Sequence, residues 1–257
     1  MKLLNSVKIA FAMFSKVPMG KTEWTEDNMR YSMCFVPLIG FLIGVVLFGW
    51  YWFCVKCRFN DVFYACIAAL IPLLVTGGIH MDGYIDVVDA LSSYGDKQKK
   101  LGILKDPHVG AFAIIWTVAY MVAVVGMFTQ AVTWKLVVMI GLEYILSRAV
   151  SCLLAVFLKN ARKEGTLYMF TCGQQKSVVS VVLMLYIFGT GIALCIIDFF
   201  AGLLVLLTLS IVVLYYRLMT YKNFGGITGD MAGFFVQVSE AAMIFATVIG
   251  CRIVEML

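Results

Sequence analysis

Long apolar runs, separated by short polar segments, are the feature that most constrains how this chain folds. Of its 257 residues, 62% are hydrophobic and only 14% are charged, and the mean hydropathy is +0.95. A soluble domain of this length cannot bury that much apolar surface. We therefore expect an all-α, polytopic integral membrane helical bundle that forms a single domain over residues 1–257.

The apolar runs predict about seven membrane-spanning helices. Their expected ranges are 32–55, 62–79, 109–130, 134–158, 177–197, 200–216 and 231–250. Three connections, at 80–108, 159–176 and 217–230, are longer and more polar than the others. In a seven-helix topology these three lie on the same side of the membrane as the N-terminus.

The N-terminal segment does not read as a cleavable signal, because Lys8 and Lys16 interrupt any apolar core. Apolar residues recur there on one side at helical spacing: Leu3, Leu4, Val7, Phe11 and Phe14. This pattern fits a short amphipathic helix lying on the membrane surface. A simple lead-in to the first span explains it equally well.

Basic residues are distributed unequally between the two predicted sides. Fifteen Lys and Arg residues fall on the side of the N-terminus and the longer loops, whereas four fall on the other side: Lys56, Arg58, Lys135 and Arg252. The positive-inside rule then predicts a cytoplasmic N-terminus, cytoplasmic active-site loops and an outward C-terminus. Since the basic residues form no single patch, no nucleic-acid partner is expected.

Three aspartates follow the second apolar run, together with one of only two histidines, His80. If a helix begins near Asp82, then Asp82, Asp86 and Asp89 fall within an arc of roughly 60° on one face. Three like charges on one face repel each other unless a cation lies between them, and an all-oxygen set suits Mg²⁺ or Mn²⁺ better than zinc. Gly83 would let a ligand approach the backbone. The alternative is a solvated helix face, and His80 is expected in the loop before the helix.

Two further motifs precede predicted spans. In the segment Lys105–Gly110, Asp106 reads as a helix N-cap and as a candidate fourth carboxylate beside phosphate. The segment 224–230 is rich in glycine and ends at Asp230, which the residues Gly233, Gln237 and Glu240 follow on one helix face. A carboxylate as deep in a span as Glu240 must face the protein interior or a wet cavity.

One basic residue lies inside a predicted span. Arg148 is placed to reach a phosphate from within the bundle, or to form an ion pair with Glu143 or Glu240. The sequence leaves both interpretations open.

The run from Thr76 to Ala90 resembles the signature of the cobalamin synthase family, the adenosylcobinamide-GDP ribazoletransferases. The segments 105–110, 147–148 and 225–230, with Glu240, are similar to that family in the same order, so the resemblance spans nearly the whole chain. It implies an enzyme of a bacterial or archaeal cytoplasmic membrane. Such an enzyme transfers adenosylcobinamide phosphate from adenosylcobinamide-GDP to α-ribazole or its 5′-phosphate, and releases GMP.

The resemblance also implies roles for residues of this chain. Asp82, Asp86 and Asp89 would hold Mg²⁺ on the diphosphate, with Asp106 and Asp230 as further ligands or bases. Asp82, Asp86 and His80 are the catalytic candidates. The remaining candidates would contact substrate or phosphate, and they are Gly83, Lys105, Arg148, Thr228 and Glu240. A homo-oligomer is compatible with this interpretation.

Two other functions remain open on the sequence. A CDP-alcohol phosphotransferase of phospholipid synthesis has a similar acidic motif, but this chain lacks the Ala-Arg pair expected shortly after Asp82-Gly83. An ion-coupled transporter would use Glu143, Arg148 and Glu240 near the membrane midplane. Against a transporter, the densest group of carboxylates lies at the end of a span, and no inverted repeat is evident.

Overall fold

The computed structural model describes residues 2–256, and within this range the regular structure is helical. The helices are α1 (Lys2–Phe14), α2 (Glu26–Met29), the 3-10 helix η1 (Ser32–Phe35), α3 (Val36–Cys57), α4 (Asp61–Thr76), α5 (Ile79–Ser92), α6 (Lys97–Ile103), α7 (Ala111–Phe128), α8 (Trp134–Phe157), α9 (Thr166–Cys172), α10 (Lys176–Ile197), α11 (Phe199–Asn223) and α12 (Gly229–Met256). One isolated bridge, between Asn160 and Ile227, joins two loops. The all-α prediction is therefore confirmed.

Six helices of the described chain are long and apolar enough to cross a membrane, and a seventh span results if α4 and α5 are counted as one bent span. This agrees with the expected number of about seven. Most predicted boundaries lie within about three residues of the observed ones, and the largest deviation is at α11, which continues to Asn223 instead of ending at 216. The chain is a multi-pass membrane protein.

The bend between α4 and α5 differs from the sequence expectation. Gly77 and Gly78 both have positive φ angles, of 68° and 81°, and the two helix axes differ in direction by 97°. A left-handed backbone at this point ends α4, and glycine adopts it without a steric penalty. The first part of the connection expected at 80–108 is the helix that the spacing of the aspartates predicted, and it begins at Ile79 and folds back into the bundle, where it buries Val87 and Ala90.

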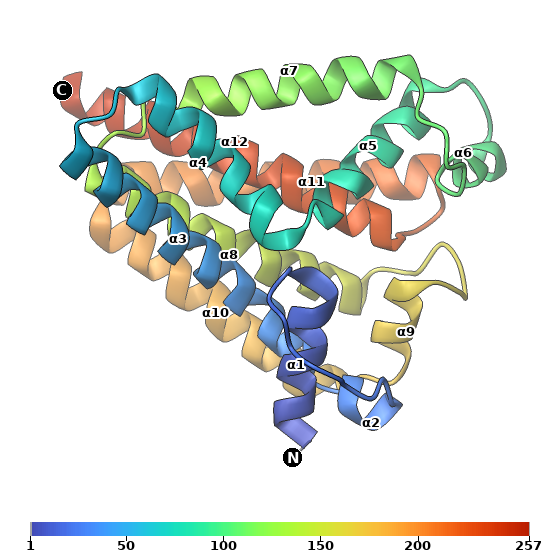
Figure 1. Cartoon of the computed structure of the whole chain (residues 1–257). Helices are drawn as coiled ribbons and strands as arrows, with labels where there is room; N and C mark the ends of the chain where they lie inside the picture. The colour runs from blue at the N-terminus through green and yellow to red at the C-terminus, as the bar shows by residue number, and fades with distance from the viewer. Residues whose placement is uncertain (1, 257) are drawn as a thin grey trace.

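Helices α8 and α12 form the centre of the bundle. α8 packs against α3, α10 and α12, while α12 also packs against α11 and α5. The apolar windows of α8 and α12 are 78% and 72% buried, compared with 17% for α7. In Figure 1, α7 accordingly lies along one edge of the molecule, and α12 runs behind α5 and α4. This explains why Lys, Arg, Asp and Glu side chains occur within α8 and α12 but not within α7.

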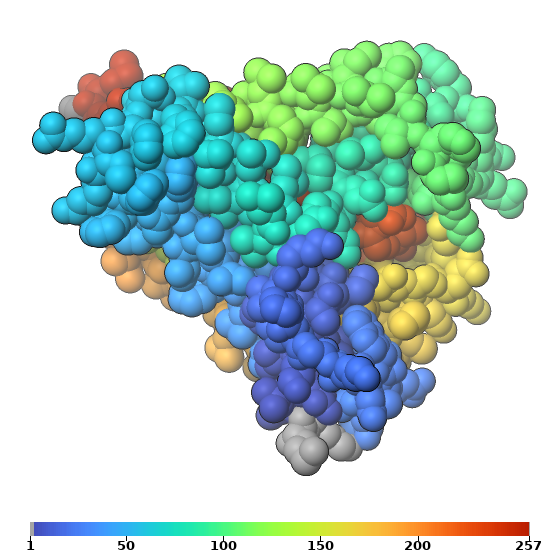
Figure 2. Space-filling model, in the orientation of Figure 1, coloured from blue at the N-terminus to red at the C-terminus, as the bar shows by residue number. Residues whose placement is uncertain are grey.

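The N-terminal helix α1 lies on the outside of this bundle. Figure 2 shows the N-terminal segment, in dark blue, between the cyan-green surface of α4 and α5 and the yellow surface that includes α9. Ile9 and Ala10 are fully buried, whereas Leu3 and Leu4 are each 61% exposed. The helix is confirmed, and its contact with a membrane surface through the exposed Leu3 and Leu4 stays a prediction. The amide of Lys16 donates to the Val75 carbonyl at 2.8 Å and ties α1 to the end of α4.

Candidate active site

The site is built where α5 crosses α12 in backbone contact. A Cβ atom added to Gly83 would lie 2.4 Å from the carbonyl oxygen of Asp230, and one added to Gly233 would lie 3.0 Å from the carbonyl oxygen of His80. Only glycine permits this approach. The structure therefore corrects the role expected for Gly83: the space beside it holds the backbone of α12 and not a ligand.

This crossing brings together carboxylates that are far apart in the sequence. Asp82, Asp86 and Asp89 lie on one face of α5, as predicted, and Asp86 is within electrostatic range of the other two and of Asp230. Asp82 is exposed, and Asp86 and Asp230 are partly buried. Within residues 2–256, no lysine or arginine forms an ion pair with Asp82, Asp86 or Asp230. Negative charge therefore accumulates at the crossing without a direct ion pair, and among the described residues Arg162 is the cation within electrostatic range of Asp230.

Two neighbours hold these carboxylates in place. Thr228 Oγ1 donates to Asp230 Oδ2 at 3.2 Å, so the predicted substrate contact Thr228 orients a carboxylate in this structure. The amide of Gly110 donates to Asp89 Oδ2 at 3.1 Å, which places Asp89 at the N-terminus of α7. A carboxylate there is stabilised by the unpaired amides and the dipole of that helix. Asp89 is thus engaged with the protein more than Asp82 or Asp86.

The donor set has the chemistry that Mg²⁺ prefers, but it is not a closed cage. Among the described residues, no group of three or more His, Cys, Asp or Glu side chains converges closely enough to hold an ion by itself. Mg²⁺ commonly keeps several waters and is bound by one or two carboxylates together with substrate phosphates. Open oxygen ligands on two facing helices fit that mode of binding.

His80 lies within the site and not in a loop, which corrects the sequence expectation. It is the second residue of α5 and is only 6% exposed, and its ring stacks on that of Phe14 with a centroid separation of 6.2 Å. Its Nε2 atom has no hydrogen-bond partner in the described protein. A buried ring nitrogen without a partner is free to exchange a proton or to contact a ligand.

Two cavities meet at Asp230. The first, of about 260 Å³, has a polar wall that includes His80, Asp82 and Arg148, and an apolar wall that includes Phe14 and Phe170. The second, of about 230 Å³, is lined by loop residues that include Asn160, Arg162 and Thr228. Four residues line both cavities: Thr166, Leu167, Gly229 and Asp230. Asp230 therefore lies at the junction of two spaces of different polarity, and Asp82 lines the first of them.

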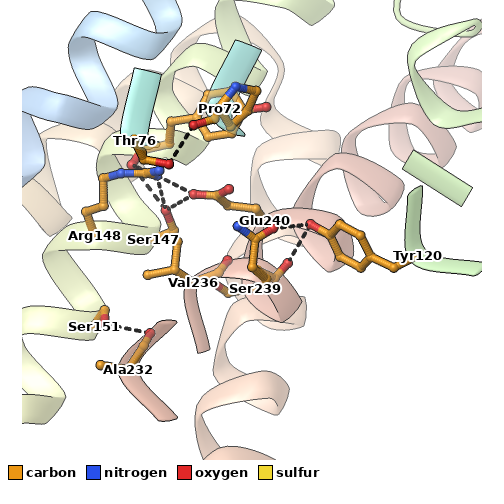
Figure 3. A network of polar contacts seen from close by, with 12 residues as sticks. Pro72, Thr76, Tyr120, Ser147, Arg148, Ser151, Ala232, Val236, Ser239 and Glu240 are labelled. Carbon is orange, nitrogen blue, oxygen red and sulfur yellow. Dashed lines mark hydrogen bonds and ion pairs between the residues drawn. The ribbon is translucent and has the colours of Figure 1, made fainter. Parts of the chain in front are cut away.

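Deeper in the bundle, Arg148 and Glu240 form a buried ion pair, which is one of the two alternatives left open by the sequence. They are 1% and 3% exposed, and Arg148 Nη1 donates to Glu240 Oε1, to the carbonyl of Tyr144 and to Ser147 Oγ. Ser147 Oγ also donates to Glu240 Oε1 at 2.9 Å. Figure 3 shows Ser147, Arg148 and Glu240 meeting in one cluster. Glu240 lines neither large cavity, so the structure gives it a structural role in place of the expected substrate contact.

The polar stripe predicted on α12 faces the protein interior. Gln237 is 4% exposed and accepts a hydrogen bond from the Tyr120 hydroxyl at 2.7 Å. Glu143 of α8 pairs with the Thr247 hydroxyl and not with Arg148. The sequence predicted that polar groups this deep in a span face the protein interior. The structure confirms this, since these side chains are buried against protein partners.

The segment around Asp106 differs from the prediction. Gly110, and not Asp106, is the N-cap of α7, since the helix begins at Ala111. Asp106 instead accepts from the amide of His108 at 3.0 Å, and its Oδ1 lies 2.7 Å from His108 Nδ1. These hydrogen bonds lower the pKa of the Asp106 carboxyl. Asp106 lines neither cavity, so its expected role as a metal ligand or base stays a prediction.

Lys105 also lies in a surface contact. Its ammonium group is 2.6 Å from Glu164 Oε1, and both side chains are more than half exposed. The hydrogen bond and the positive charge of Lys105 lower the pKa of the Glu164 carboxyl. Because Glu164 lines the second cavity, Lys105 acts at the rim of the site through a neighbour.

Sequence reasoning missed residues that reach the site from distant segments. Phe14 comes from α1 and Phe170 from α9, and both line the first cavity. Arg162 lines the second cavity, donates to the Leu101 carbonyl, and lies within electrostatic range of Asp230. The sequence offered Arg162, in the loop 159–176, as a possible phosphate contact or a solvated loop residue, and it placed Phe14 on the apolar face of the N-terminal helix without linking either residue to Asp230.

Comparisons with known proteins agree with this geometry. The family model described as cobalamin-5-phosphate synthase matches residues 6–248. A protein of Lachnoclostridium phytofermentans named adenosylcobinamide-GDP ribazoletransferase is 39% identical over 249 residues, covering 97% of this chain and 95% of the relative. Relatives of the same name from Clostridium botulinum and Treponema denticola are 29% and 30% identical, and they cover 95% and 92% of this chain and 97% and 94% of their own lengths. No solved structure matches the chain.

The match covers the whole bundle, including the α5–α12 crossing, and not just one motif. It favours a transferase of cobalamin synthesis over the phospholipid enzyme and the transporter that the sequence left open. The chain therefore belongs to the cobalamin-5-phosphate synthase family.

Proposed function

We propose that the protein transfers adenosylcobinamide phosphate from adenosylcobinamide-GDP to α-ribazole or its 5′-phosphate, releasing GMP. The observation that carries the proposal is a group of carboxylates without a direct ion pair, Asp82, Asp86 and Asp230, of which Asp230 lines both cavities and Asp82 lines the first. Family membership and the printed names of the relatives supply the substrates. The product is adenosylcobalamin or its 5′-phosphate.

The carboxylates would hold Mg²⁺, or Mn²⁺ in its place, through Asp82, Asp86 and Asp230, with Asp89 completing the acidic face. When bound, the ion supplies charge neutralisation to the phosphate oxygens and the leaving GMP. Thr228 keeps Asp230 oriented, and the close crossing of α5 and α12 keeps the carboxylates facing one another. Positioning of this kind provides much of the catalysis in phosphoryl transfer.

His80 is the protein group best placed to take the proton of the attacking ribazole hydroxyl. Its Nε2 has no protein partner, and it lines the same cavity as Asp82. The new bond forms between the ribazole oxygen and the phosphorus that bears cobinamide, and the bond from that phosphorus to the oxygen of GMP breaks. Arg162, beside Asp230 in the second cavity, is placed to bind the phosphates of the nucleotide.

The experiment is GMP release by the purified protein in lipid, supplied with adenosylcobinamide-GDP and α-ribazole, with Mg²⁺ or with chelator. We expect GMP and the cobalamin product in equal amounts, and only when the metal is present. GMP release without a corrin–ribazole product would overturn the transfer, whereas equal turnover in chelator would overturn the metal assignment alone.

We further propose that the site opens toward the cytoplasm of a bacterial or archaeal cell. The unequal distribution of Lys and Arg supports it. Two exposed cysteines test it, Cys57 at the end of α3 and Cys172 at the end of α9. In single-cysteine variants, a membrane-impermeant maleimide added to intact cells should label Cys57, and should label Cys172 only after lysis; the reverse pattern would invert the topology.

A further inference from the structure

The first cavity combines features that the proposed reaction does not yet use. Its apolar wall contains Phe14, Met33 and Phe170, contributed by α1, η1 and α9. The Phe14 ring lies 5.6 Å from the ring of Phe170 and 6.2 Å from that of His80. Stacked and tilted aromatic rings at these separations form a surface suited to a flat, weakly polar ring.

The polar wall contains hydrogen-bond donors that the protein leaves unused. Arg148 is 1% exposed and lines the cavity, yet its Nε and Nη2 atoms have no hydrogen-bond partner in the described chain. Buried donors are nearly always paired in folded proteins, so two free N–H groups beside a cavity indicate a missing acceptor.

Charge determines what kind of acceptor fits. The positive charge of Arg148 is already balanced by Glu240, and Asp82 and Asp230 add negative charge to the same wall. Apart from His80, Arg148 is the only basic side chain among the residues of 2–256 that line this cavity. Because Glu240 already takes the charge of Arg148, an uncharged oxygen or ring nitrogen can accept from the remaining N–H groups of Arg148 and needs no charge of its own.

We propose that the first cavity is the acceptor subsite, and that it selects the aromatic base of ribazole by ring size and neutrality. The inference rests on the proposed function for the identity of the acceptor. The base lies against Phe14 and Phe170, Arg148 donates to an uncharged acceptor of the nucleoside, and the ribose hydroxyl faces His80 and Asp82. The nucleotide phosphates of the other substrate occupy the second cavity, beside Arg162.

α1 thereby becomes part of the substrate pocket. Figure 2 shows the N-terminal segment lying over the surface between α5 and α9, where the apolar wall is formed. Met13 and Phe14, at its end, line the cavity, and the Lys16–Val75 hydrogen bond holds this end in place. Base selectivity is therefore contributed in part by a helix outside the membrane-spanning set.

The test compares Phe14→Ala with Phe11→Ala, a matched change on the same helix at a residue that does not line the cavity. In the wild-type protein and in both variants, KM is measured separately for ribazole and for adenosylcobinamide-GDP. We expect Phe14→Ala to raise KM for ribazole about 10-fold, as expected for losing an aromatic contact, and to leave KM for adenosylcobinamide-GDP unchanged. Equal effects of the two variants, or equal rises for both substrates, would overturn the proposal.

A second variant tests ring size and does not depend on how Phe14→Ala folds. Ala155 lines the cavity from α8, and Ala155→Met narrows it with a flexible side chain. The ratio of kcat/KM for the two-ring base of ribazole to that for a ribosyl imidazole should fall about 10-fold or more. A ratio equal to that of the wild type would show that the base binds elsewhere.

Equilibrium binding separates this inference from the proposed function. Calorimetry with ribazole alone, in chelator and without the GDP substrate, should detect binding to the wild-type protein and to Phe11→Ala, and about 10-fold weaker binding to Phe14→Ala. If the wild-type protein releases no GMP but shows this binding pattern, the proposed reaction fails and the subsite stands. If GMP release is normal and Phe14→Ala binds ribazole as tightly as the wild-type protein does, the subsite is refuted and the proposed reaction is unaffected.

Discussion

Helix α12 carries acidic groups in two contrasting environments. Near its start, Asp230 faces Asp82 and Asp86 beside two cavities and has no ion-pair partner within residues 2–256. Further along, Glu240 is buried and paired with Arg148. The charge and hydrogen bonds of Arg148 offset the hydration that the Glu240 carboxylate loses in the bundle interior. The paired group holds helices together, and the unpaired groups keep their charge available for a ligand.

The largest effect is expected at the unpaired carboxylates. Asp82→Asn should lower the rate of GMP release by about 1,000-fold or more, because it removes an oxygen ligand and a charge from the face opposite Asp230. The thermal unfolding midpoint in detergent should not fall, since no ion pair is broken. If Asp82→Asn instead lowers stability strongly and its folded fraction stays active, Asp82 has a structural role like that of Glu240, and the contrast between the two groups is wrong.

The buried pair should respond in the opposite way. Glu240→Gln leaves the Arg148 charge unpaired in the bundle, and we expect a loss of about 3–5 kcal/mol in the free energy of unfolding. Denaturant titration in mixed micelles measures it, with Asp230→Asn as the matched change on the same helix. Replacing both Arg148 and Glu240 by Met should recover much of the loss. If the double variant is less stable than Glu240→Gln, pairing is not the reason for the cost.

The contact that brings the two environments together is tested by Gly83→Ala. The added Cβ would meet the Asp230 carbonyl at 2.4 Å and force α5 away from α12. We expect a loss of about 1–3 kcal/mol in stability, together with lower activity. Gly126→Ala is the control, because a Cβ at that position in α7 meets nothing within 4 Å. A similar loss in both variants would point to the backbone conformation instead of the crossing.

The smallest effect is expected at the exposed pair of Lys105 and Glu164. The pKa of Glu164 is held below its usual value, so any stabilisation is present at neutral pH and is lost as the pH falls through the lowered pKa. Because both side chains are more than half exposed, solvent screens the interaction. Glu164→Gln should leave the unfolding midpoint at pH 7 unchanged within error. A clear drop would mean that the loops around the second cavity contribute to global stability.

Helix number and the acidic face could be predicted because they depend on local pattern. Apolar runs located the spans, and the spacing of Asp82, Asp86 and Asp89 gave the face of α5. The depth of Glu240 in an apolar run indicated burial, which the structure confirms. Each inference needed only residues close together in the sequence and the geometry of one helix.

The errors occurred where a residue's role depends on a distant segment. Nothing near Gly83 shows that the backbone of α12 fills the space beside it, and nothing near Asp106 shows that the N-cap lies four residues later. His80 was placed in a loop because a helix extended back from Asp82 would point its side chain away from the three aspartates. In the structure the chain bends at Gly77 and Gly78, and α5 already begins at Ile79. Phe14 could not be found, since α1 meets α9 only in the folded molecule.

The position of α12 at the end of the chain has a consequence for biogenesis. Arg148 belongs to α8, which is synthesised and inserted well before Glu240 leaves the ribosome. Until then the Arg148 guanidinium lacks the Glu240 carboxylate. An unpaired charge is costly in the hydrocarbon core, so we expect water, lipid headgroups or the insertion machinery to stabilise it. Asp230 arrives on the same helix as Glu240. Insertion of α12 therefore pairs Arg148 and completes the acidic site in one step, and a chain truncated before residue 229 would lack both.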